Sequence, residues 1–169
     1  YSNQLESMRN LTVFDGMGYV SGQNNLDIPI SGFLTPTVGP VSFELGVVAY
    51  EGDRGIQGDR FQFDGAGGFL DVPDPLRTPS DFFNSTITSG GTLTPFRNPS
   101  YNNMLGFDNG IFIPDNSAFT YIGNAATSAT IRVVTTQDAI LPRVITSAID
   151  IYEPDLRATV FIDDINGPP

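Results

Sequence analysis

A stretch of strict alternation between residues 41 and 50 constrains the fold of this chain more than any other feature. Its apolar side chains fall on one side of an extended backbone: Val41, Phe43, Leu45, Val47 and Ala49. A period of two is typical of a β-strand with one face in a core. Residues 51–59, directly after it, carry three carboxylates between glycines that permit tight turns. The sequence therefore predicts a central strand that leads into an acidic loop.

Shorter segments with the same alternation recur along the chain and are separated by residues typical of turns. They are residues 10–14, 26–30, 60–63, 129–135 and 144–152. The 18 Gly and 13 Pro favour short strands over helices, and 13 Phe can fill the space between two sheets. We therefore predict an all-β fold, a two-sheet antiparallel β-sandwich of the jelly-roll or immunoglobulin-like kind with little helix.

One sandwich domain is expected over residues 1–154, followed by an extension over residues 155–169. Within the domain, Asp108, Asn109 and Gly110 predict the turn of a hairpin. Residues 64–80 are rich in Gly, Pro and Asp and predict a long surface excursion. Excursions of this length are commonly functional.

The charge and the missing residue types narrow the possible functions. A formal net charge of −11 argues against nucleic acid as a partner, because phosphate binding needs a basic surface. The chain has no Cys, no His and no Lys, which excludes thiol catalysis, a Ser-His-Asp triad and Schiff-base chemistry. No apolar run approaches the roughly 20 residues of a membrane span. We therefore predict that the protein is not an enzyme and does not cross a membrane.

Carboxylates in two loops could bind a hard cation. Glu51, Asp53 and Asp59 could ligate Ca²⁺, which prefers oxygen ligands, although their spacing is not that of an EF-hand. Asp108 and Asp115, with their neighbouring Asn residues, form a second oxygen-rich stretch. The alternative for each stretch is a solvated turn in which Asp side chains cap the local backbone. Ca²⁺ is the only cofactor that the sequence suggests.

Six stretches together resemble one known domain type. They are VFDGMGYV, SGFLTPTVGPVSFELGVVAYEGDRGIQGD, FFNSTI, NMLGFD, ATSATIRVVT and VITSAIDIYEPDL. This domain occurs in long bacterial surface proteins, ahead of arrays of the conserved-repeat domain of unknown function number eleven. The resemblance covers roughly Tyr1 to Pro154 and implies a β-sandwich module of a secreted, wall-attached or adhesin-like protein. It implies no catalytic residues. In the family pattern an apolar strand precedes the position of Tyr1, and the sequence here begins at or inside the end of that strand.

The segment after the predicted domain alternates again. Its apolar positions are Leu156, Ala158, Val160 and Ile162, and it resembles the first strand of the repeat domain that would follow. A sandwich without its first strand would expose an apolar groove and unpaired backbone groups. Segment 156–162 has the length and alternation to fill such a groove in the next molecule by strand addition. The alternatives are that it folds back on its own sheet or serves as a linker.

These observations predict a non-catalytic, extracellular structural or adhesive module of a bacterial surface protein or filament. Its expected partners are copies of itself or adjacent domains of the same protein. The alternative is a glycan-binding or protein-binding module that is displayed on the cell surface through the loops at residues 51–59 and 64–80.

Overall fold

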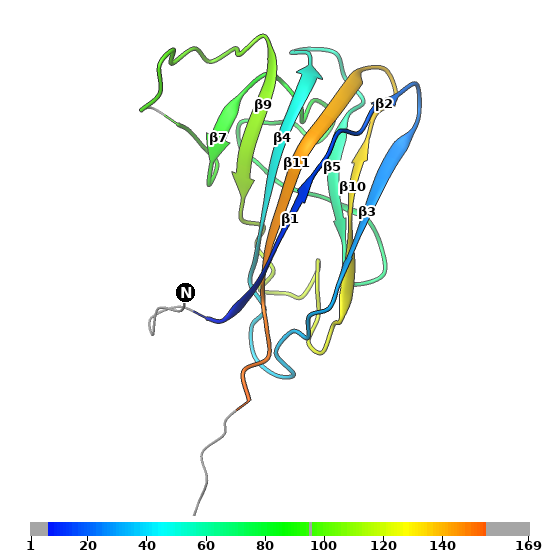
Figure 1. Cartoon of the computed structure of the whole chain (residues 1–169), viewed down its shortest axis with the longest axis vertical. Helices are drawn as coiled ribbons and strands as arrows, with labels where there is room; N and C mark the ends of the chain where they lie inside the picture. Colours follow the sequence, from blue (N-terminus) through cyan, green and yellow to red (C-terminus); the bar gives the residue numbers. More distant parts are fainter. Residues whose placement is uncertain (1–6, 95, 155–169) are drawn as a thin grey trace, which may run out of the picture.

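The computed structural model describes residues 7–94 and 96–154, which form two β-sheets packed against each other (Figure 1). The predicted all-β sandwich is therefore confirmed. Within these residues there is no helix, and hence none long and apolar enough to cross a bilayer.

The described residues contain eleven strands. They are β1 (Arg9–Asp15), β2 (Val20–Ser21), β3 (Asn25–Ser31), β4 (Phe43–Gly52), β5 (Arg60–Asp64), β6 (Leu70–Asp71), β7 (Ile87–Ser89), β8 (Thr92–Leu93), β9 (Gly106–Phe112), β10 (Ser128–Val134) and β11 (Ala139–Asp150).

The larger sheet has the strand order β1-β11-β4-β9-β7-β8, and β2 also pairs with β11. The smaller sheet has the order β3-β10-β5-β6. Neighbouring strands are antiparallel except for β7 and β9, which run parallel. The two longest strands, β4 and β11, lie side by side in the larger sheet. In these two strand orders, β1 and β3 are edge strands, one in each sheet.

The alternation in β4 and just before it produces the core as predicted. The five apolar residues from Val41 to Ala49 are each at most 3% exposed. Phe61 and Phe63 of β5 face them from the smaller sheet and are fully buried. The ring of Phe43 stacks on that of Phe63, with centroids 4.7 Å apart. Period-two patterning therefore determines which side of each central strand lies between the sheets.

The prediction of a hairpin turn at Asp108, Asn109 and Gly110 is wrong, because β9 runs through these residues without a turn. Asp108 points inward and forms an ion pair with Arg77 at 2.7 Å. The Phe112 ring lies over Gly110, so closely that a Cβ atom at residue 110 would overlap it. A sequence that favours a turn in isolation is thus kept extended by its contacts in the fold, among them the ion pair with the distant Arg77.

The segment predicted as a surface excursion over residues 64–80 is partly buried. It contains the short strand β6, and Val72 and Arg77 within it are nearly inaccessible to solvent. Gly67 and Gly68 form the exposed turn of this segment, where their N–H groups donate to Asp64. Only part of the segment is therefore available for contacts outside the molecule.

Candidate functional site

The acidic loop after β4 folds against two carboxylates from other parts of the chain. Asp59 forms an isolated β-bridge with Asp81. The backbone N–H of Asp53 donates to Asp138 Oδ2 at 3.1 Å, and that of Gly55 donates to Asp81 Oδ2 at 3.2 Å. We refer to Asp53, Asp59, Asp81 and Asp138 as the acidic corner. Three separate segments thus bring four carboxylates into one region.

Asp59 is the most deeply buried member of the acidic corner. Its side chain is inaccessible to solvent, and its Oδ2 accepts a hydrogen bond from the backbone N–H of Phe83. Its Oδ1 has no hydrogen-bond partner, and neither has the buried Oδ1 of Asp81. Burial, with the neighbouring charges of Asp81 and Asp138, raises the pKa of Asp59 to about 6. Burial also raises the pKa of Asp138.

The three residues predicted to bind Ca²⁺ separate in the structure. Asp53 and Asp59 both lie in the acidic corner. Glu51 is exposed at a bulge where the pairing of β4 with β9 shifts register, and its backbone has a φ of 67°. Among the described residues, no hydrogen bond joins the Glu51 side chain to the acidic corner. The structure brings Asp81 and Asp138 to Asp59 in its place.

The carboxylates of the second predicted metal site lie in different surroundings. Asp108 is buried, and both of its oxygens accept hydrogen bonds from protein donors: Arg77 and the backbone N–H groups of Ser85 and Thr86. Burial raises the pKa of Asp108 despite the favourable charge of Arg77. Asp115 lies on an exposed turn, where a hydrogen bond from the Ser117 N–H lowers its pKa. The oxygens of Asp108 are thus already committed within the core.

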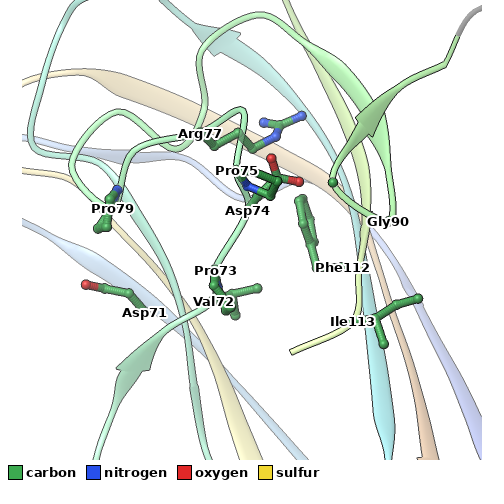
Figure 2. Close-up of a pocket in the computed structure, with 11 residues that line it drawn as sticks. Asp71, Val72, Pro73, Asp74, Pro75, Arg77, Pro79, Gly90, Phe112 and Ile113 are labelled. Atoms are coloured by element: carbon green, nitrogen blue, oxygen red, sulfur yellow. The ribbon is translucent and has the colours of Figure 1, made fainter. Parts of the chain in front are cut away.

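A pocket of about 510 Å³ lies beside residues 71–79 (Figure 2). Val72 and Pro73 line one side of it, and Phe112 and Ile113 line the other. Asp74 reaches the pocket, but its oxygens accept hydrogen bonds from the Leu76 N–H and the Thr88 hydroxyl. The pocket therefore offers mainly apolar walls to a ligand.

An apolar groove opens between the two edge strands β1 and β3. It encloses about 180 Å³, and its apolar lining comes from Phe14 of β1, Leu26 and Ile28 of β3, and Pro142 and Ile145 of β11. The charged residues Asp15 and Arg143 also line it. Phe14, Leu26 and Ile28 are only partly buried although they pack against the core. We refer to this feature as the β1–β3 groove. Apolar side chains that pack against the core are thus partly open to solvent along these edge strands.

The β1–β3 groove and the point where the described chain ends lie at opposite ends of the sandwich. Asp15 pairs with Val144 at the groove end of β1, whereas Arg9 pairs with Asp150 at the other end. Figure 1 shows the described chain leaving β11 at the lower end. The predicted assembly strand, with Leu156, Ala158, Val160 and Ile162, lies outside the described residues.

No protein-family model matches the chain, and a search of curated proteins finds no relative. The resemblance to a bacterial surface-protein domain therefore stays a prediction.

Sequence reasoning missed Asp81, Asp138 and the ion pair between Arg77 and Asp108. Asp81 follows a segment of irregular composition, and Asp138 precedes β11 in a connection, so neither belongs to a recognisable motif. Their proximity to Asp59 depends on which strands become neighbours. A periodic pattern in one segment does not indicate which other strands will lie beside it.

Proposed function

We propose that this chain is a non-catalytic, extracellular structural or adhesive module that joins neighbouring copies by strand addition. The observation that carries the proposal is the β1–β3 groove, which is apolar and bordered by two edge strands. An edge strand presents unpaired backbone groups that can accept a further strand. Pairing supplies backbone hydrogen bonds, and the groove, which encloses about 180 Å³, can bury part of the apolar face of the added strand.

The proposed occupant of the groove is segment 156–162 of a second copy. Its alternating apolar residues match what a strand needs if one face is to enter the groove. The chain leaves the sandwich at the end opposite the groove, so one molecule can reach the groove of the next without reversing direction. A contact of this kind is head to tail and need not close, so repetition builds a filament.

The absence of His, Cys and Lys supports a non-catalytic role, because these residues supply most nucleophiles and general bases. The resemblance to a domain of bacterial surface proteins supports an extracellular location. Both arguments come from the sequence and are independent of the groove.

Removal of residues 155–169 is expected to convert an assembling protein into a monomer. We would compare the full chain with the truncated chain by size-exclusion chromatography with light scattering and by negative-stain microscopy. Adding the truncated chain to the full chain should shorten the filaments, because the truncated chain accepts a strand but offers none. An unchanged distribution of oligomers after truncation would contradict strand addition.

Cysteine cross-linking separates exchange between molecules from folding back. The chain has no Cys of its own, so the introduced thiols are the only ones present. We would mix a chain carrying Leu26→Cys with a chain carrying Val160→Cys. A disulfide-linked heterodimer is expected, and replacing Leu26→Cys by the exposed control Val38→Cys should abolish it. A single chain carrying both Leu26→Cys and Val160→Cys tests folding back. If this double variant cross-links only within one chain, the segment folds back and exchange is refuted.

The pocket beside residues 71–79 favours a second candidate function, the binding of a glycan or peptide. Its volume of about 510 Å³ lies in the range typical of ligand sites. Ile113 is exposed at one wall, so Ile113→Arg should block the pocket without disturbing the core. Binding on a glycan or peptide array that this variant loses would favour this function, and binding that it keeps would locate the ligand elsewhere.

A further inference from the structure

We propose that the acidic corner binds a Ca²⁺ ion through the carboxylates of Asp59 and Asp81, with Asp138 supplying a third negative charge beside them. This inference is independent of strand addition, because none of these residues lines the β1–β3 groove.

The first argument is the buried oxygen of Asp59. A buried polar atom without a partner is rare in folded proteins, because it loses its bonds to water and gains none in return. Asp59 is inaccessible to solvent and its Oδ1 has no partner. Asp81 is only partly buried, but its Oδ1 is buried and also lacks a partner, and the two residues are joined by a β-bridge. A cation that is coordinated by both oxygens would satisfy both atoms.

The second argument is the charge around these oxygens. No ion pair seen among the described residues includes a member of the acidic corner. Arg54, the next residue after Asp53, donates instead to the carbonyl oxygens of Asn84 and Asn102. Carboxylates that are buried together repel one another unless a cation or a proton neutralises them. A divalent cation compensates two such charges at once.

The chemistry of the donors favours Ca²⁺ among the divalent cations. All of the available side-chain donors in the corner are oxygens, and the chain has neither His nor Cys to attract a softer metal. Within the described residues, no three acidic side chains already converge on a single point. Two carboxylates with backbone carbonyls and water can complete the flexible shell of about six to eight oxygens that Ca²⁺ accepts.

Such an ion would connect parts of the fold that are distant in sequence. Asp59 immediately precedes β5 of the smaller sheet, Asp138 immediately precedes β11 of the larger sheet, and Asp81 lies in the segment that leads to β7. The Gly58 N–H donates to the Ser80 carbonyl, and the Gly58 carbonyl accepts from the Thr136 N–H. The segment that carries Asp59 is therefore already hydrogen-bonded to the segments that carry Asp81 and Asp138. Ca²⁺ bound here would therefore tie the two sheets together at one end.

The test is a melting experiment on the whole chain at neutral pH, in EDTA and in millimolar Ca²⁺ at matched ionic strength. Ligand binding to the folded state raises stability, so a Ca²⁺ concentration about 100 times the Kd should raise Tm by about 5–10 °C. Calorimetric titration should give one ion per chain. The variants Asp59→Asn and Asp81→Asn should both lose the Tm shift and the binding heat.

The exposed control Asp115→Asn should keep the full response to Ca²⁺. In EDTA, Asp59→Asn should melt at or above the temperature of the natural chain, since it removes an uncompensated buried charge. That comparison distinguishes a lost metal ligand from a damaged fold. If Asp59→Asn does not fold, Asp81→Asn provides the same comparison.

A natural chain whose Tm and titration heat do not respond to Ca²⁺, or respond to Mg²⁺ alone, would overturn the assignment. So would a response that survives in both variants.

Discussion

Replacing Arg77 with methionine is expected to lower the free energy of unfolding by about 3–5 kcal/mol, because it leaves the carboxylate of Asp108 buried without its partner. The side chains of both residues are completely inaccessible to solvent, and their charged groups lie 2.7 Å apart. Methionine fills a similar volume but cannot neutralise Asp108. The loss measured would thus be mainly the cost of an uncompensated charge.

The guanidinium of Arg77 also donates to backbone carbonyls to which no other described side chain donates. It donates to the carbonyl oxygens of Phe82, Thr86 and Asn109, and its Nε donates to the Thr88 hydroxyl. These acceptors come from the segment before β7, from β7 itself and from β9, so one side chain joins all three. A lysine presents a single ammonium and cannot span this set. We therefore expect Arg77→Lys to destabilise the protein as well, by less than Arg77→Met.

Urea unfolding followed by circular dichroism measures these differences. Arg60→Met is the matched control, because Arg60 pairs with Asp71 at the surface, where such pairs contribute at most about 1 kcal/mol. Adding Asp108→Asn to Arg77→Met should recover part of the loss, since it removes the charge and keeps an oxygen acceptor. A stability for Arg77→Met within about 1 kcal/mol of the natural chain would show that the buried pair is energetically unimportant.

The parts of this fold that the sequence predicts are those set by local periodicity. In β4, β5 and β10, alternate residues enter the core as their patterns indicate, because a period of two assigns each side chain to a face. The turn predicted from residue types at Asp108–Gly110 was wrong. There the Asp and Gly residues that favour a turn are used for a buried ion pair and for the close approach of the Phe112 ring.

The candidate sites depend on strand neighbours, which periodicity does not specify. Asp59 was predicted because it belongs to a conspicuous acidic loop, whereas Asp81 and Asp138 stand alone in irregular segments. Arg77 lies in a Pro-rich segment that resembles surface, yet its side chain is buried. To predict the β1–β3 groove, one must know that β1 and β3, the edge strands of the two sheets, lie on the same side of the sandwich. Each of these features appears only once the topology is known.

Phe61→Ala is expected to lower the free energy of unfolding by about 3–5 kcal/mol, because a fully buried aromatic ring is replaced by a cavity. Phe61 lies on β5 of the smaller sheet, and its ring centroid is 5.8 Å from that of Phe112 on β9 of the larger sheet. The rings of Phe82 and Phe83 surround it at 5.5 and 6.2 Å. It therefore contacts both layers and the segment between them, so its loss removes packing that the neighbours cannot easily replace.

Denaturant unfolding would again be the measurement, and Phe96→Ala is the matched control. The Phe96 side chain is 99% exposed, so its removal should change the free energy of unfolding by no more than about 0.5 kcal/mol. Phe61→Leu should cost less than Phe61→Ala, because leucine keeps much of the buried volume. Equal losses for Phe61→Ala and Phe96→Ala would mean that the aromatic cluster does not join the two sheets. A graded series from Phe61→Leu to Phe61→Ala would instead identify cavity formation between the layers as the cause.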